Sequence, residues 1–215
     1  MEVKQQLIQT AHALFMRYGI KSVSMDDIAR ELGISKKTIY QYVDNKTDLI
    51  EQIFRSEIED DKCMMELIKT QANDAIEEIV KIARFAIKKL RQLSPTTVYD
   101  LQKYYLNTWK AMEALHQRHM YQLMRENIEL GIRQGVYRQG INPDIIAKLY
   151  VAKTSLVADE ELFPLGQYNL EELFKEYILY HMHGVASEKG LKILNAHLAD
   201  LSAEGHKTDK QINKI

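Results

Sequence analysis

Apolar residues recur along most of this chain at the spacing of three or four that places them on one face of a helix. In the first segment the positions on that face are Leu7, Ile8, Ala11, Leu14, Phe15 and Tyr18. Gly19 follows and predicts the end of this helix, because glycine readily adopts the left-handed conformation of helix C-termini. Alternation of β-branched and polar residues is nearly absent, and the chain has only three prolines. The pattern predicts an all-α fold.

Short polar signals divide the next stretch into two short helices. Ser24 and Asp27 form a capping box, in which the hydroxyl and the carboxylate satisfy each other's backbone amides. Gly33 ends that helix with a tight turn. Ser35 can cap a further helix, which is predicted to run to about Tyr42.

Longer helices are predicted downstream. One of them begins at Asn45. The others are predicted over residues 74–93, 109–134, 142–160 and 169–186. Asn45 has Asp48 three residues later and Asn142 precedes a proline, both of which are typical helix starts. Pro95 is predicted to break the chain between two of these helices.

Length and composition limit the class of protein. The chain has 215 residues, of which 46% are hydrophobic and 27% charged, as in ordinary soluble proteins. No signal peptide and no run of about 18 apolar residues is visible, so a cytoplasmic location without membrane contact is expected. The lone Cys63 cannot form an intrachain disulfide.

Catalytic and metal-binding patterns are missing. We find no nucleophile with an adjacent base and no glycine loop that could hold phosphate. His116 with His119, and His181 with His183, are pairs for which the sequence supplies no third ligand. No enzymatic activity, cofactor or metal is therefore expected.

Residues 24–50 carry the most specific chemistry. They form a helix, a glycine turn and a second helix, in which Ile39 and Val43 face inward. The positions left facing outward are Ser35, Lys36, Lys37, Thr38, Gln41 and Tyr42. Because the net charge of the chain is −1, any attraction to a polyanion must be local, and residues 33–47 carry three lysines against one acid. This chemistry suits phosphates and base edges in a DNA major groove.

The same stretch resembles the TetR family of repressors. The matching segments are Ser24-Met25-Asp26-Asp27-Ile28-Ala29, then Gly33 through Val43, then Asn45-Lys46-Thr47-Asp48-Leu49. The resemblance aligns Lys36, Lys37, Thr38 and Gln41 with recognition-helix residues that reach bases or nearby phosphates, and Tyr40, Tyr42 and Lys46 with residues that hold the DNA backbone. With the two capping serines, the candidate DNA-binding residues are Ser24, Ser35, Lys36, Lys37, Thr38, Tyr40, Gln41, Tyr42 and Lys46.

The resemblance also implies a domain organisation. It places a three-helix, helix-turn-helix DNA-binding domain at residues 1–50 and a larger helical ligand-binding and dimerisation domain at 51–201. The polar residues 202–215 are expected to form a flexible tail. Family members pair two subunits through the helices that correspond to 142–160 and 169–186, so a homodimer is expected. A twofold pair of recognition helices then predicts a near-palindromic operator.

Aromatic and methionine residues in the middle of the chain are candidates for an effector pocket. The candidates are Phe85, Tyr105, Trp109, Met112 and Tyr121, and they would suit a small apolar or amphipathic ligand. Side chains of this kind at helical spacing are also typical of plain core packing. The sequence leaves both interpretations open.

Together these features predict a sequence-specific DNA-binding transcriptional regulator, which we expect to be a repressor released from a palindromic operator by a small-molecule effector. The alternative is a helical DNA-binding or dimeric interaction protein of the same fold without small-molecule control. A short palindromic site with ligand-released binding would favour the first, and diffuse binding to any sequence would favour the second.

Overall fold

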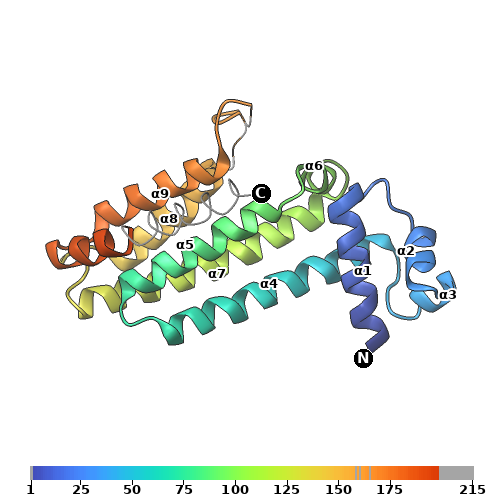
Figure 1. Ribbon diagram of the computed structural model, residues 1–215, viewed down its shortest axis with the longest axis horizontal. Helices are drawn as coiled ribbons and strands as arrows, with labels where there is room; N and C mark the ends of the chain where they lie inside the picture. The colour runs from blue at the N-terminus through green and yellow to red at the C-terminus, as the bar shows by residue number, and fades with distance from the viewer. Residues whose placement is uncertain (1, 158, 160, 165, 199–215) are drawn as a thin grey trace, which may run out of the picture. The chain divides into compact units, whose positions relative to one another are not determined.

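The computed structural model describes residues 2–157, 159, 161–164 and 166–198, so the predicted tail at 202–215 lies outside the described residues. The helices are α1 (Glu2–Tyr18), α2 (Met25–Leu32), α3 (Lys36–Ile39), α4 (Lys46–Gln71), α5 (Ala75–Gln92), α6 (Pro95–Tyr104), α7 (Leu106–Arg133), α8 (Pro143–Val157) and α9 (Leu170–Val185) (Figure 1). Residues 188–198 are also helical. The all-α prediction is confirmed.

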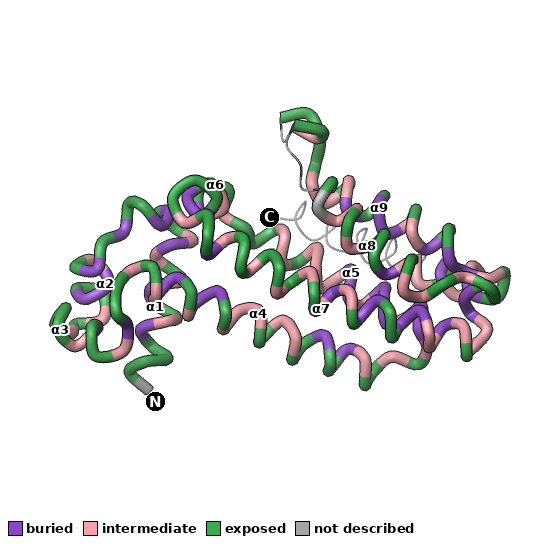
Figure 2. The backbone as a smooth tube through the Cα atoms, turned by 180° about the vertical axis from the view of Figure 1, so that it is seen from behind, coloured by how far each residue is buried: buried purple, intermediate pink, exposed green. Residues whose placement is uncertain are grey.

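The chain forms two compact units. The N-terminal unit comprises Met1–Met64 together with Gln92–Arg118, and the C-terminal unit comprises Met65–Arg91 together with the residues from His119 onward. Each unit has a hydrophobic core of its own, and Figure 2 shows buried positions recurring between exposed ones along the helices. The predicted DNA-binding domain at residues 1–50 lies within the first unit, which also takes in α6 and the start of α7.

The later helix starts are formed by the residues that predicted them. The Asn142 side-chain oxygen accepts a hydrogen bond from the Asp144 amide at 3.0 Å, and α8 begins at the proline between them. The Asn169 oxygen accepts one from the Glu172 amide, also at 3.0 Å, at the start of α9. Such caps depend on residues two or three positions apart, which is why the sequence reveals them.

Pro95 interrupts the chain after α5 as predicted, but the helix that begins there, α6, was not predicted. Pro95 occupies the first turn of α6. Backbone amides in the first turn of a helix have no intrahelical partner, so the amide hydrogen that proline lacks is not needed there. Ser94 caps this helix, since its hydroxyl accepts a hydrogen bond from the Thr97 amide at 3.3 Å. The serine-proline pair is a helix-start signal that was available in the sequence.

The core of the N-terminal unit joins residues from several helices. Phe15 of α1, Ile28 of α2, Ile39 of α3 and Ile50 of α4 are fully withdrawn from water, and Leu101 of α6 lies in the same cluster. Burying an aliphatic or aromatic side chain of this size contributes about 1.5–3 kcal/mol. The short helices of this unit are therefore fixed by shared burial.

In the C-terminal unit, Tyr137 joins α5 to α7. It is buried, and its hydroxyl donates to the Asn127 side-chain oxygen of α7 at 2.8 Å and lies 3.2 Å from the Ala75 carbonyl oxygen of α5. The neighbouring Arg138 amide donates to the Val185 carbonyl oxygen of α9 at 2.9 Å. The Tyr137 ring lies directly against Gly131 of α7, where a Cβ atom would overlap it.

We predict that Gly131→Ala lowers the free energy of unfolding by about 1–3 kcal/mol, because the added methyl group must displace the Tyr137 ring from a packed core. The measurement is urea denaturation followed by circular dichroism. Gly166→Ala is the matched control, since a Cβ at Gly166 meets no atom within 4 Å. Equal stability of the two variants would contradict the packing described here.

Candidate nucleic-acid interface

Helix α2 is capped at both ends as its sequence predicts. The Ser24 hydroxyl accepts a hydrogen bond from the Asp27 amide at 3.2 Å, and the Asp27 carboxylate accepts one from the Ser24 amide at 2.9 Å. Gly33 ends the helix in the left-handed conformation, at φ 65° and ψ 27°. The Ile34 amide then donates to the Ala29 carbonyl oxygen at 3.0 Å and closes the turn that leads to α3.

Helix α3 is a single turn that is also locally capped. The Ser35 hydroxyl accepts a hydrogen bond from the Thr38 amide at 3.0 Å. The helix ends at Ile39 rather than at about Tyr42, and turns follow, in which the Tyr42 amide donates to the Ile39 carbonyl oxygen at 2.9 Å. Ile39 and Val43 are buried as predicted.

The outward side of this segment carries most of the predicted DNA-contacting side chains. The exposed members of the set are Ser24, Ser35, Lys36, Lys37, Tyr40 and Gln41, and the partly buried members are Thr38, Tyr42 and Lys46. Tyr42 packs against the hydrophobic core, so only part of its ring is available to a ligand. The structure thus brings all nine residues into one unit.

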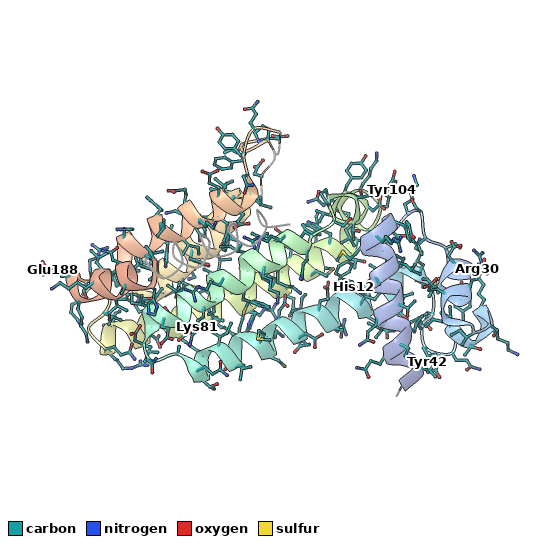
Figure 3. All side chains as sticks on the ribbon, in the orientation of Figure 1. His12, Arg30, Tyr42, Lys81, Tyr104 and Glu188 are labelled. Carbon is teal, nitrogen blue, oxygen red and sulfur yellow. The ribbon has the colours of Figure 1, made fainter. Side chains whose placement is uncertain are left out.

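The cations of this surface differ in how far they are already paired. Lys36 forms an ion pair with Asp26 at 2.9 Å, and this hydrogen bond raises the pKa of Lys36. Both side chains are exposed, so the pair contributes little to stability and can open. Arg30 extends outward from α2, 3.4 Å from Asp27 (Figure 3). Lys37 has no hydrogen-bond or ion-pair partner in the part of the chain that the structure describes.

Lys46 is more enclosed than the other lysines of the set. It is the first residue of α4, and its ammonium group donates to the Ile20 carbonyl oxygen at 2.5 Å and to the Val23 carbonyl oxygen. Burial lowers its pKa, an effect that the carboxylates of Asp100 and Asp27 oppose. Lys46 therefore stabilises the turn between α1 and α2, a role that the sequence did not reveal.

Helix α6 contributes further residues that the sequence analysis missed. The Thr97 hydroxyl donates to the Phe15 carbonyl oxygen at 2.7 Å, and the Asp100 carboxylate accepts a hydrogen bond from the Lys21 amide at 2.8 Å. The second pair is separated by 79 positions in sequence. Local patterns carry no information about such a pairing.

The five candidate effector residues do not gather in one place. Phe85 and Tyr121 pack against the core of the C-terminal unit, whereas Tyr105, Trp109 and Met112 pack against the core of the N-terminal unit. A groove lies between α8 and α9 of the C-terminal unit, and none of the five residues lines it. Among the described residues, no three His, Cys, Asp or Glu side chains form a metal-binding group, and no helix is long and apolar enough to cross a membrane.

Comparison with known sequences identifies related proteins. Residues 7–53 match the family described as bacterial regulatory proteins, tetR family. The chain is 27% identical over 191 residues to the "Uncharacterized HTH-type transcriptional regulator YhgD" of Bacillus subtilis, covering 82% of this chain and 94% of that protein. It is 21% identical over 202 residues to the "HTH-type transcriptional repressor KstR2" of Rhodococcus jostii, covering 86% and 91%.

Solved structures share the fold. A transcriptional regulator from Cytophaga hutchinsonii superposes with a TM-score of 0.72 at 19% identity, covering 85% of this chain and 98% of that one. SmeT, the repressor of the Stenotrophomonas maltophilia multidrug efflux pump SmeDEF, superposes with a TM-score of 0.68 at 15% identity, covering 86% and 91%.

Proposed function

Because this chain is a DNA-binding transcriptional regulator of the TetR family and not an enzyme, we propose that it acts as a homodimeric repressor on a near-palindromic operator. The observation that carries the proposal is the α2–α3 segment, whose polar residues lie outward on a buried apolar base. Operator binding on the chromosome also leads us to propose a cytoplasmic location.

Within this proposal the residues of α3 read the operator. Lys37 is exposed and has no partner among the described residues, so no intramolecular ion pair must break before it reaches a base or a phosphate. Lys36 must first leave Asp26, an exchange of one exposed ion pair for another. The short side chains of Ser35 and Thr38 allow the backbone of α3 to approach the groove closely.

Selection of DNA from a random pool tests the proposal directly. The expected result is a short palindromic site, and Lys37→Ala is expected to lose about 1–3 kcal/mol of discrimination at particular base pairs of that site. Lys110→Ala is the matched control, since Lys110 is an exposed lysine of α7 in the same unit. Recovery of unrelated sequences by the wild-type protein, or identical preferences in the two variants, would count against this assignment.

We further propose that α8 and α9 form the dimer interface. Their exposed side chains include large apolar groups that water solvates poorly, namely Ile145, Leu149, Leu156 and Tyr180. The groove between these helices is lined by residues such as Leu149, Tyr150 and Leu179. A second copy related by a twofold axis would cover this face and place two recognition helices on one operator.

Leu149→Glu is predicted to convert the dimer to a monomer and to weaken operator binding by roughly tenfold or more, because a monomer reads one half-site. Analytical ultracentrifugation gives the oligomeric state, and fluorescence anisotropy gives the affinity. Leu67→Glu on α4 is the control, since Leu67 and Leu149 are both 48% exposed. A Leu149→Glu protein that remains dimeric would rule out this interface.

We also propose that a small apolar or amphipathic ligand relieves repression. Two similar proteins, KstR2 and SmeT, are named repressors, which supports the direction of control. An effector that binds the conformation unable to bind DNA more tightly than the DNA-binding conformation would lower operator affinity. The size of that change is set by the coupling free energy between the effector site and the DNA-binding surface.

A panel of apolar and amphipathic compounds, tested on the dimer bound to its selected operator, should contain one that weakens binding by about 5-fold to 150-fold. The same compound should raise expression of a reporter placed behind the operator. Operator binding that no compound changes would instead favour a regulator of this fold without small-molecule control.

A further inference from the structure

The turn between α1 and α2 is held from two sides. Its backbone runs from Ile20 to Val23, and the ammonium group of Lys46 on α4 binds the carbonyl oxygens at both ends. From α6, the Asp100 carboxylate accepts the hydrogen bond of the Lys21 amide at 2.8 Å. The Lys46 ammonium group therefore satisfies two carbonyl acceptors of this turn, and the Asp100 carboxylate satisfies one amide donor.

The approach of α6 to this turn is close. Asp100 is only 5% exposed. Gly19 precedes the turn at φ 81°, and a Cβ atom there would lie 2.8 Å from the Thr96 methyl group and 3.1 Å from the Asp100 carboxylate. Only glycine permits both the backbone conformation and this distance.

The charges on the two sides are complementary. Burial disfavours the charged form of Lys46 and lowers its pKa, while the negative charge of Asp100 acts in the opposite direction. On the outer side of the turn, the Lys21 ammonium group donates to the Tyr104 hydroxyl of α6 at 2.9 Å, and Figure 3 shows Tyr104 beside the end of α1. Helix α6 thus contacts this turn through two of its residues.

This turn leads directly into the proposed DNA-binding surface. Ser24, the capping residue of α2, follows Val23, and Lys46 begins α4. An ammonium group has three N–H donors, so two carbonyl bonds leave one that can reach a phosphate. The orientation of that donor depends on the position of the turn.

We propose that Asp100 is a positioning residue for DNA binding: from α6, outside the helix-turn-helix, it fixes the α1–α2 turn and thereby the Lys46 ammonium group and the start of α2. Asp100 itself makes no contact with DNA. This inference rests on the proposed operator binding.

The test measures operator affinity of Asp100→Ala and Asp100→Asn as a function of salt. Asp100→Ala removes the charge and the acceptor, and affinity should fall roughly tenfold, the effect of losing one charge-assisted hydrogen bond. Asp100→Asn keeps an oxygen for the Lys21 amide and should lose less. Both variants should keep the wild-type base preference, and Asp100→Ala should lower the slope of log affinity against log salt by up to about one, because the displaced Lys46 ammonium group no longer neutralises a phosphate.

Two control variants separate positioning from loss of stability. Thr97→Val removes the bond from α6 to Phe15 without altering the contacts of the turn, and Tyr137→Phe removes buried hydrogen bonds in the other unit. Both should lower the melting temperature and leave operator affinity within about twofold, since neither residue contacts the turn.

Three outcomes would overturn the inference: wild-type affinity in folded Asp100→Ala, a changed base preference in Asp100→Ala, or an equal loss of affinity in Thr97→Val. If Asp100→Ala does not fold, Asp100→Asn decides by the same criteria. Failure of the wild-type protein to select any operator would instead refute the proposed function.

Discussion

The shared hydrophobic core of the N-terminal unit is the constraint on which the DNA-binding surface depends. Helix α3 has four residues, too few to be stable in water without packing, because nucleating a helix fixes several residues for one hydrogen bond. It persists because Ile39 is fully buried with Phe15 and Ile28, and because Ser35 satisfies an amide at its start. The outward lysines occupy defined positions only as long as that burial holds.

Helix α6 extends this dependence beyond the helix-turn-helix. Leu101 contributes to the same core, while Thr97 and Asp100 of the same helix bind backbone groups of α1 and of the turn that follows it. The bond from the Lys21 amide to the Asp100 carboxylate is partly buried, and a hydrogen bond to a charged group contributes about 1.5–3 kcal/mol. The unit that presents the recognition helix therefore includes residues of α6 that lie about eighty positions after the α1–α2 turn in sequence.

The C-terminal unit shows the same division between apolar packing and a few buried polar bonds. Tyr137 fills space left by Gly131, and its hydroxyl joins α7 to α5 through Asn127 and the Ala75 carbonyl group. The large apolar side chains that this unit leaves exposed concentrate on α8 and α9, with Leu149 and Tyr180 among them. Exposed apolar area of this kind favours association with another protein surface.

The sequence by itself determined most of the helices, although not α6 or the end of α3, and it determined the chemistry of the α2–α3 segment. Capping at Ser24, Ser35 and Asn169 involves residues three positions apart, and the inward spacing of Ile39 and Val43 follows from helical periodicity. Only the tertiary structure decided that Lys46 and Asp100 hold one turn, and that Trp109 belongs to a different core from Phe85. Periodicity shows that a side chain is buried but not which residues pack against it. Those residues lie far away in sequence and become neighbours only when the chain folds.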